Sequence, residues 1–388
     1  MKPLRPTWCE IDLNALRHNL SEVRRAAGDA AILAVVKADA YGHGVEGVVP
    51  ALQEAGVEMF GVALVEEGIA LRQLGVNQPI LVMGGAPVGT EKYLLEYSLQ
   101  PIVSDLAAAL RLNETALSAD SCLSYHLKVD TGMGRLGARL DDLAELLPAL
   151  YDLQGLSLVG VMSHLAVADE PERSFTAVQK QRFETVAAQV EQAGFVPRYW
   201  HLANSAGIFS LDLPFQTLVR PGIVLYGGLT GAYFDQTVSQ KPVMHLISHI
   251  AQLKELAVGD TVSYGQRFTA VRPTRVAAIP IGYADGYNRL LSNRGELLIR
   301  GQRVPVVGTV CMDWILADVT DLEQVAVGDR VTLLGSDGQE CISAEEWAEK
   351  VGSITYEVFC GISKRVPRIY KETSSPVADP QYGPKGED

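Results

Sequence analysis

The chain has 388 residues, of which 47% are hydrophobic and 20% are charged. This balance is typical of a globular protein with room for two domains. Its 33 basic and 46 acidic residues give a net charge of −13, and no segment is strongly basic, which argues against nucleic acid as a partner. No uncharged apolar run reaches about 18 residues, so we expect no membrane-spanning helix and no membrane partner.

The N-terminus and the cysteines together indicate a cytoplasmic protein. Residues 1–16 lack the apolar core of a signal peptide. Five cysteines, an odd number, are scattered along the chain without the spacing of metal ligands. Free thiols in a reducing compartment are the expectation. The cysteines are Cys9, Cys122, Cys311, Cys341 and Cys360.

Short aliphatic runs alternate with longer amphipathic segments over the first 230 residues. Eight runs are predicted to be strands: 31–38, 59–64, 79–84, 100–105, 124–130, 156–164, 198–205 and 218–227. Alternation of this kind predicts a parallel sheet with helical crossovers. Eight such units favour a closed β/α barrel of the TIM type, with an open doubly wound sheet as the alternative. The predicted barrel domain covers residues 1–235, and about the first ten residues are candidates for the second domain instead.

The pattern changes near residue 236. Segments such as "AQLKELAVGDTVSYGQRFTA" and "GELLIRGQRVPVVGTV" are rich in strand-forming residues and are interrupted by glycine-containing turns. They predict a mostly antiparallel β domain over residues 236–370. The tail 371–388 is polar and proline-rich, and we expect it to be disordered.

Polar residues stand where five of the predicted barrel strands end. Active sites of β/α barrels are built at the C-terminal ends of the strands. Lys37 ends the first predicted strand, and Arg135 follows the fifth. The remaining four are His164 on the sixth strand, Asn204 and Ser205 on the seventh, and Arg220, with Gly222, on the eighth. These positions predict one shared site.

Lys37 is the most informative of these residues. It follows an aliphatic run directly, where a lysine either reaches into solvent or has a chemical task. A desolvated lysine amine loses its proton readily and attacks aldehydes, which fits an aldolase or a pyridoxal phosphate enzyme. Barrels commonly bind phosphate at the loops after strands seven and eight, and here "ANSAG" (203–207) and "RPGIVLYG" (220–227) supply Ser205, Gly207 and Gly222 at those positions. Together these features favour pyridoxal phosphate.

Three further features remain ambiguous on the sequence alone. "GMGRLG" (132–137) matches the dinucleotide fingerprint, but the next predicted strand ends in Ser163-His164 and not in a carboxylate. Asp39 and His43 suggest a metal, yet no third ligand is near, and turn hydrogen bonding explains them better. We therefore predict no metal. Lys128 fits a carboxylate partner inside the barrel.

The chain resembles the alanine racemases, a fold-type III pyridoxal phosphate family, from about residue 5 to residue 370. The similarity rests on an ordered series of motifs: "VVKADAYGHG", "KVDTGMGRLG", "HLANSAG", "RPGIVLYG", "VSYGQRF", "PIGYADGY", "CMD" and "YEVFCGISKRVPR".

The resemblance implies a role for each matched residue. Lys37 would hold pyridoxal 5'-phosphate covalently and act as one acid/base, and Tyr264 would be the base on the opposite face. Arg220 would face the pyridine nitrogen, and His164 would lie between Arg220 and Tyr264. The residues implied in cofactor binding, besides Lys37 and Arg220, are Tyr41, Asn204, Ser205, Gly222, Ile223 and Tyr356.

The same resemblance implies how substrate binds and how subunits assemble. Arg135 and the Met312 backbone amide would hold the carboxylate of alanine, and Tyr283 and Tyr356 would narrow the entrance. Lys128 matches a position that is often carbamylated in the family. The second domain would complete the barrel site of a partner, giving a homodimer with shared sites. The implied activity is interconversion of L- and D-alanine, supplying D-alanine for peptidoglycan.

Two other functions compete with a racemase. A decarboxylase of related fold would pair the pyridine nitrogen with a carboxylate, and Arg220 at that position argues against it. A non-catalytic pyridoxal phosphate carrier would need only the barrel, and the β domain with Tyr264 argues against that reading.

Overall fold

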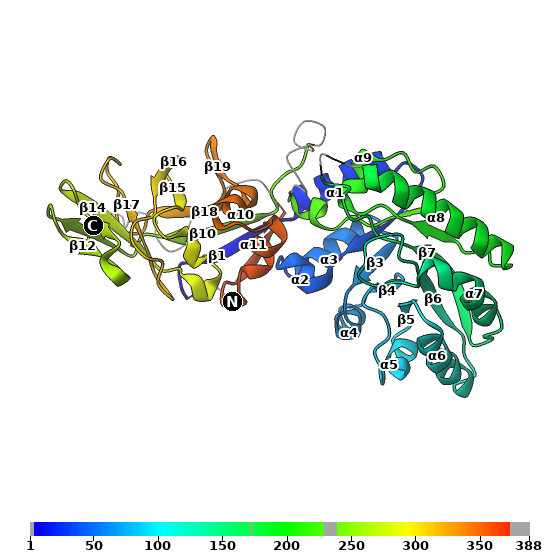
Figure 1. The fold of residues 1–388 in the computed structure, drawn as a ribbon. Coiled ribbons are helices and arrows are strands. Elements are labelled where there is room, and N and C mark those ends of the chain that lie inside the picture. The colour runs from blue at the N-terminus through cyan, green and yellow to red at the C-terminus, as the bar shows by residue number, and fades with distance from the viewer. Residues whose placement is uncertain (1–3, 171, 173, 229–238, 373–388) are drawn as a thin grey trace.

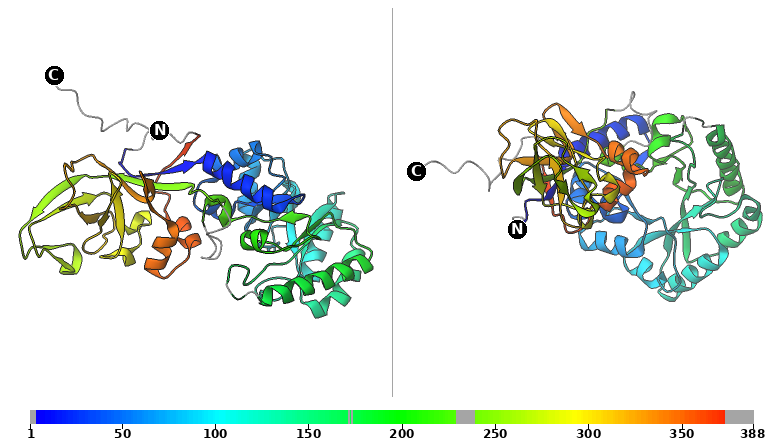
Figure 2. Two further views of the ribbon diagram at one scale, coloured as in Figure 1. Left: turned by 90° about the horizontal axis from the view of Figure 1, so that it is seen from above. Right: turned by 60° about the vertical axis from the view of Figure 1, so that its left-hand side comes forward.

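The computed structural model describes residues 4–170, 172, 174–228 and 239–372. Two units lie next to each other in an elongated molecule: a helix-covered barrel and a β-rich unit (Figure 1, Figure 2). The predicted domain boundary at residues 235/236 lies outside the described residues. Most of the predicted disordered tail, residues 373–388, also lies outside the described residues. Its first residue, Lys371, is the last residue of a strand.

Eight parallel strands form the barrel in the order β8-β7-β6-β5-β4-β3-β2-β9. Their bounds are β2 Ala31–Val35, β3 Met59–Val62, β4 Ile80–Val82, β5 Leu99–Val103, β6 Leu123–Lys128, β7 Leu156–Met162, β8 Tyr199–His201 and β9 Leu218–Val219. The Thr217 amide donates to the Trp200 carbonyl at 3.0 Å, which joins the two ends of the sheet. The predicted barrel is confirmed, and the open sheet is excluded.

Helices cover the outside of this barrel (Figure 1). The helical segments of this unit are α1 Leu13–Ala27, α2 Lys37–Tyr41, α3 Val45–Glu54, α4 Val65–Gln73, α5 Glu91–Glu96, α6 Leu106–Ser118, α7 Leu143–Tyr151, α8 Ser174–Gln192 and α9 Ser205–Ser210, with 3-10 turns η1 Leu140–Asp142 and η2 Ile223–Tyr226. The strands that they cover are almost fully buried, as in β3 and β4. Burial on both faces explains the unbroken aliphatic runs of the sequence.

The strands end earlier than the sequence predicts. β2 stops at Val35, so Lys37 is the first residue of α2 and not the last of a strand. His164 lies two residues beyond β7, and Ser205 opens α9. Arg220 follows β9 directly. These four functional groups therefore stand just beyond the strands. The reason is that each strand ends before the aliphatic run of the sequence does.

The second unit is built mainly from antiparallel sheets, as predicted. Its largest sheet has the order β16-β15-β18-β10-β1-β20, with β19 on β18, and β11-β14-β17 and β12-β13 form two smaller sheets. Among the described strands of this unit, β1 and β20 are the one pair in parallel. The bounds are β1 Trp8–Asp12, β10 Met244–His249, β11 Gln252–Leu256, β12 Thr261–Val262, β13 Phe268–Thr269, β14 Thr274–Ile279, β15 Glu296–Ile299, β16 Gln302–Pro305, β17 Ile315–Asp318, β18 Arg330–Asp337, β19 Glu340–Ile342 and β20 Arg368–Lys371.

The N-terminal strand β1 lies inside this second sheet, between β10 and β20. Two helices that the sequence pattern did not predict, α10 Ala344–Val351 and α11 Thr355–Gly361, also belong to this part of the chain. Three 3-10 turns complete it: η3 Tyr264–Gln266, η4 Tyr283–Asp285 and η5 Arg289–Leu291.

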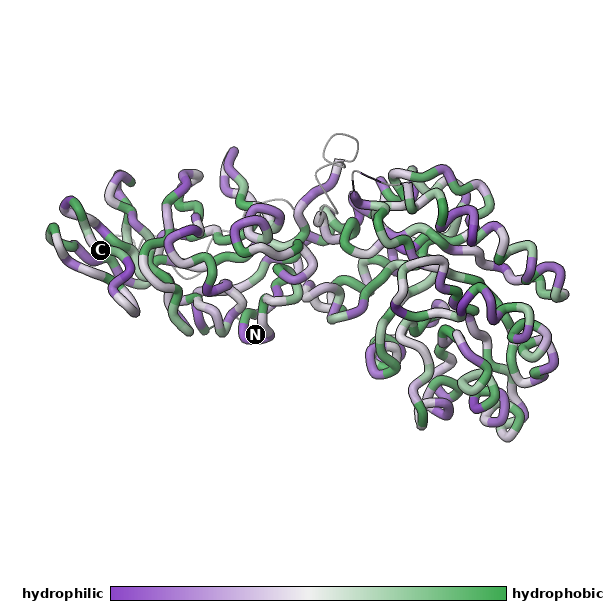
Figure 3. The backbone as a smooth tube through the Cα atoms, viewed as in Figure 1, coloured by the Kyte–Doolittle hydropathy of each residue, from purple (hydrophilic) through white to green (hydrophobic). Residues whose placement is uncertain are grey.

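The hydropathy of the backbone follows this architecture. The β18–β19 hairpin reaches away from its sheet and is hydrophilic at the tip, which holds Asp337 and Glu340 (Figure 3). Within the described ranges, no helix is long and apolar enough to cross a bilayer.

Candidate active site

A cavity of about 560 Å³ lies at the C-terminal ends of the barrel strands. It brings together eleven of the residues that the sequence proposed for the site. They are Lys37, Tyr41, Lys128, Arg135, His164, Asn204, Ser205, Arg220, Gly222, Ile223 and Tyr356. Ten of them lie at the end of, or just after, five different strands (β2, β6, β7, β8 and β9), and Tyr356 comes from α11.

The charged groups of this cavity are mostly cationic. Lys37, Lys128, Arg135 and Arg220 line it, and Asp169 is the carboxylate among the described lining residues. Closely spaced positive charges in a partly buried cavity favour anionic ligands such as phosphates and carboxylates.

A left-handed turn presents Lys37 to the cavity. Residues 38–41 all have φ between 52° and 54°, a conformation that costs non-glycine residues about 1–2 kcal/mol each. The Glu67 carboxylate holds this turn: one oxygen accepts from the Ala38 amide at 2.6 Å, and the other accepts from Ala63 at 2.8 Å. Glu67 thus ties the loop after β2 to the loop after β3.

Both lysines of the cavity have a lowered pKa. Burial, and then the positive charge of Arg135, lowers the pKa of Lys37. Burial, and then Arg220, lowers the pKa of Lys128 to about 7. No carboxylate of the described chain forms an ion pair with Lys128, so the pairing suggested by the sequence is absent there. Either amine is more nucleophilic at neutral pH than an exposed lysine.

Arg220 is buried, and its terminal nitrogens are held by the barrel. One donates to the His201 carbonyl at 2.6 Å and lies 3.3 Å from His201 Nδ1. The other donates to the carbonyls of Ser163 at 2.6 Å and Leu202 at 3.1 Å, and lies 3.4 Å from His164 Nδ1. Burial lowers the pKa of Arg220 to about 9, so the guanidinium stays charged at neutral pH. Its Nε–H has no hydrogen-bond partner among the described residues.

The histidines next to Arg220 are neutral, with defined tautomers. Since arginine only donates, His201 accepts at Nδ1 and carries its proton on Nε2, which donates to His126 Nδ1 at 2.9 Å. His126 then donates from Nε2 to Gln100 at 3.1 Å. His164 likewise accepts at Nδ1 and keeps its proton on Nε2. Burial and then Arg220 place the pKa of His164 well below its ordinary value.

Ser205, Gly222 and Tyr41 form a cradle in the wall of the cavity. The Gly222 amide donates to Ser205 Oγ at 2.9 Å. A Cβ atom on Gly222 would lie 2.5 Å from the Tyr41 hydroxyl, so a larger residue here would have to displace that hydroxyl from the cradle. Hydroxyls and open backbone next to a helix start are the groups with which proteins bind phosphate.

Three proposed residues lie elsewhere. Among the described residues, the lining of the cavity includes none of Tyr264, Tyr283 and Met312. All three lie in the β-rich unit with exposed side chains, at 71%, 42% and 52%. A single chain therefore does not bring them to the cavity.

The two ambiguous sequence motifs have structural explanations. In "GMGRLG" the amides of Gly132 and Gly134 donate to Asp130, and no helix begins until residue 140, which does not fit a dinucleotide fingerprint. Asp39 accepts from the Val45 amide at 2.9 Å, and the His43 ring contacts two backbone carbonyls. These are turn hydrogen bonds, the explanation that the sequence favoured for Asp39 and His43.

Sequence reasoning missed the rest of the lining. Met83 and Gly84 follow β4, and Ala63 follows β3, so their position after a strand was the available signal.

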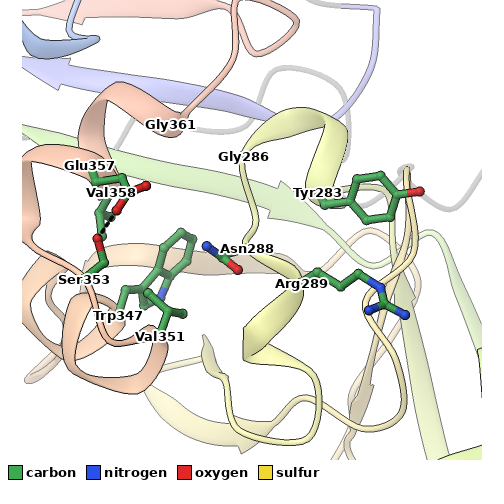
Figure 4. Close-up of a pocket in the computed structure, with 10 residues that line it drawn as sticks. All are labelled: Tyr283, Gly286, Asn288, Arg289, Trp347, Val351, Ser353, Glu357, Val358 and Gly361. Carbon is green, nitrogen blue, oxygen red and sulfur yellow. Dashed lines mark hydrogen bonds between the residues drawn. The ribbon is translucent and has the colours of Figure 1, made fainter.

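A second cavity, of about 300 Å³, lies between η4, η5 and the helices α10 and α11 (Figure 4). Tyr283 and Trp347 are among its lining residues.

Comparison with known proteins adds the family. Residues 11–230 match the alanine racemase N-terminal domain, and residues 243–370 match the C-terminal domain. The chain is 50% identical over 375 residues to an alanine racemase of Geobacter sulfurreducens, covering 95% of this chain and 98% of that protein.

Solved structures agree with this result. The alanine racemase of Bacillus anthracis with bound L-Ala-P has a TM-score of 0.91 at 34% identity, covering 97% of this chain and 98% of that one. That of Bartonella henselae with covalently bound pyridoxal phosphate has a TM-score of 0.86 at 30% identity, covering 94% and 99%. The chain belongs to the alanine racemase family.

Proposed function

We propose that this protein is a pyridoxal phosphate-dependent racemase that interconverts L- and D-alanine. The observation that carries the proposal is the cationic cavity at the barrel mouth, with a buried lysine, in a chain that matches both domains of the family. Production of D-alanine for peptidoglycan is the role that family membership suggests.

The residues of the cavity fit pyridoxal phosphate. The cradle of Ser205, Gly222 and Tyr41 suits the phosphate, together with Asn204, Ile223 and Tyr356 in the same wall. The unpartnered Nε–H of Arg220 suits the pyridine nitrogen. Because an arginine does not give up its proton readily, that nitrogen would stay unprotonated. A carboxylate would protonate it, so Arg220 favours racemisation over decarboxylation.

Lys37 is the proposed attachment point and one acid/base. Its lowered pKa supports attack on an aldehyde at neutral pH. Bound pyridoxal phosphate supplies a conjugated ring that stabilises negative charge at the substrate α-carbon. Lys37 would then remove or return the α-proton on one face. Arg135 would bind the substrate carboxylate, and Lys128 is proposed to be carbamylated, which would place an anion beside Arg135 and Arg220.

Tyr264 is the proposed acid/base on the opposite face. Racemisation removes a proton from one face and returns one to the other, so two flanking groups are required. His164 supports this role, because its Nε2–H is available to donate to the Tyr264 oxygen. Met312 would contact the substrate carboxylate through its amide, and Tyr283 and Tyr356 would narrow the entrance.

A homodimer with shared sites would bring these groups together. The side chains of Tyr264, Tyr283 and Met312 are exposed on the β-rich unit. They cannot form a complete site without the lysine and the cradle, which belong to the barrel. In a two-fold dimer each β-rich unit would close the partner's barrel. The free cysteines of the chain support a location of the protein in the reducing cytoplasm.

Incubation of the purified protein with L-alanine tests the proposal. We expect optical rotation to decay to zero with equal amounts of both enantiomers. Release of carbon dioxide would instead identify a decarboxylase, and no change in the presence of bound cofactor would identify a carrier. A panel of amino acids scored for enantiomer interconversion would then rank alanine against serine and bulkier substrates.

A further inference from the structure

Three loops of the β-rich unit carry the side chains that the barrel cavity lacks. They are residues 263–266 with Tyr264, residues 282–286 with Tyr283 and residues 309–313 with Met312, and together we call them the three-loop platform. The Thr309 hydroxyl donates to the Tyr264 carbonyl at 2.7 Å. The Tyr283 amide donates to the Cys311 carbonyl at 3.0 Å. The middle loop, 309–313, is therefore bonded to both of its neighbours.

Loops 282–286 and 309–313 are also in direct contact. The Ala284 amide donates to the Met312 carbonyl at 3.1 Å. A Cβ atom on Gly282 would lie 2.3 Å from the Cys311 oxygen and 2.4 Å from the Met312 oxygen. A displacement of one loop must therefore displace the other, and with it Met312.

The buried carboxylate of Asp285 anchors loop 282–286 to Arg5 and Arg365. Its side chain is fully buried and accepts from both terminal nitrogens of Arg5, at 2.8 and 3.2 Å, and from the Gly282 amide at 3.1 Å. Arg365 lies 3.6 Å from the same carboxylate and donates to Asp313 at 2.7 Å. A buried carboxylate needs such partners, and losing one leaves an uncompensated charge.

Loop 282–286 also packs against the end of α11. A Cβ atom on Gly286 would lie 2.4 Å from the Gly361 carbonyl, and the Ser363 amide donates to the Asp285 carbonyl at 3.0 Å. Figure 4 shows Gly286 facing the end of α11, with the Tyr283 side chain directed away from that helix. The turn is thus held on its inner side and presents Tyr283 outward.

We propose that Arg5 and Asp285, linked to Asp313 through Arg365, are positioning residues that set the geometry of the three-loop platform. Through it they would control substrate affinity and proton transfer in the partner's cavity. This inference rests on the proposed racemase function and the shared site. Its physical basis is that a displacement of about 1 Å can reduce a rate by about 100-fold.

Asp285→Asn tests the proposal with little change in shape. We expect the dimer to form and to keep its cofactor, while racemisation falls about 10- to 100-fold with a raised KM. Hydrogen exchange should be faster at the amides of Tyr283 and Ala284. Asp321→Asn is the matched control, because Asp321 also pairs with an arginine, Arg272, but on the surface. The Asp321 variant should change neither the racemisation kinetics nor the hydrogen exchange at loop 282–286.

Two arginine variants cover the case in which Asp285→Asn does not fold. Arg365→Gln removes a half-exposed side chain, and Arg5→Lys keeps the charge but loses the two-pronged contact. Both should raise KM and speed exchange at loop 282–286, more weakly than Asp285→Asn. Wild-type KM and wild-type exchange in the folded variants would overturn the proposal.

Purified heterodimers with two different tags show which site Asp285 serves. When Lys37→Ala is on one chain and Asp285→Asn on the other, the one active site has an intact platform, so wild-type KM is expected. When both changes are on one chain and the other is wild type, the one active site has the altered platform, so the raised KM is expected.

The outcomes separate this inference from the proposed function. The reverse pattern would mean that Asp285 acts within its own chain, and wild-type KM in both heterodimers would mean that it does not position the site. Either result would overturn the proposal. A wild-type protein that binds cofactor but does not racemise alanine would refute the function itself.

Discussion

Lys37 and Lys128 line the same cavity, and both have a lowered pKa, so burial alone does not identify the reactive amine. Their positions differ. Lys128 is the last residue of β6 and is 5% exposed. Lys37 stands at the start of the left-handed turn, on the same segment as Tyr41 of the cradle. This placement assigns the covalent bond to Lys37 in our proposal.

The assignment predicts a simple chemical result. Wild-type protein should be yellow, and borohydride should fix the cofactor on Lys37. Lys37→Ala should lose the borohydride-fixable cofactor, whereas Lys128→Ala should retain it. Mass spectrometry of the labelled peptide identifies the lysine. A label on Lys128 would refute the assignment.

Tyr264→Phe removes the proposed second acid/base and keeps the aromatic ring. Groups of this kind typically contribute about 10²–10⁴-fold, so racemisation should fall on that scale in both directions. Lys37 should still exchange the α-proton of one enantiomer, which family resemblance suggests is D-alanine. In deuterated water, NMR should show D-alanine losing its α-proton without forming L-alanine. Equal exchange from both enantiomers would rule out Tyr264 as the base.

At the scale of elements, the sequence predicts strands better than the turns that follow them. The run 31–38 continues without a polar residue through Val36, yet β2 ends at Val35. Asp39, Gly42 and Gly44 signal a turn, but four consecutive left-handed residues are not readable from propensity, because tertiary contacts stabilise them. Glu67, which supplies such a contact, lies 29 residues away from Ala38.

Glu67 offers a test of this element. Glu67→Gln replaces one carboxylate oxygen by a donor that cannot accept from backbone amides. Hydrogen bonds to charged groups contribute about 1.5–3 kcal/mol each, so the free energy of unfolding should fall by about that amount. Cofactor retention should weaken too, because Lys37 directly precedes the turn and its position depends on it. Thermal denaturation of both forms measures the first effect and dialysis the second.

Glu66→Gln is the matched control for that prediction. Glu66 is exposed on the same helix, α4, and the structure gives its side chain no bond to the left-handed turn. Its substitution should leave both measurements unchanged. Equal behaviour of the Glu66 and Glu67 variants would mean that the turn is held by other contacts.

At the scale of the whole molecule, the limits of sequence reasoning are clear from two regions. The barrel could be predicted because each strand leaves its own aliphatic signal. The first ten residues were candidates for the second domain, but the pairing of β1 with β10 and β20 could not be predicted, since pairing across more than 200 residues leaves no local pattern. The family resemblance alone points to Tyr264 and Met312, because residues that complete another chain's site, as we propose for these two, leave no local signal.

The shared site makes the final prediction. If each site takes Lys37 from one chain and Tyr264 from the other, a dimer of a Lys37→Ala chain with a Tyr264→Phe chain has one site with both changes and one with neither. Random exchange of subunits puts about half of the dimers in this mixed form, so roughly a quarter of all sites should be restored. Mixing two nearly inactive variants should then recover activity. If both residues came from one chain, every site would keep one change, and mixing would recover nothing. Absence of recovery in heterodimers confirmed by native mass spectrometry would refute the shared site and leave the cofactor assignment to Lys37 intact.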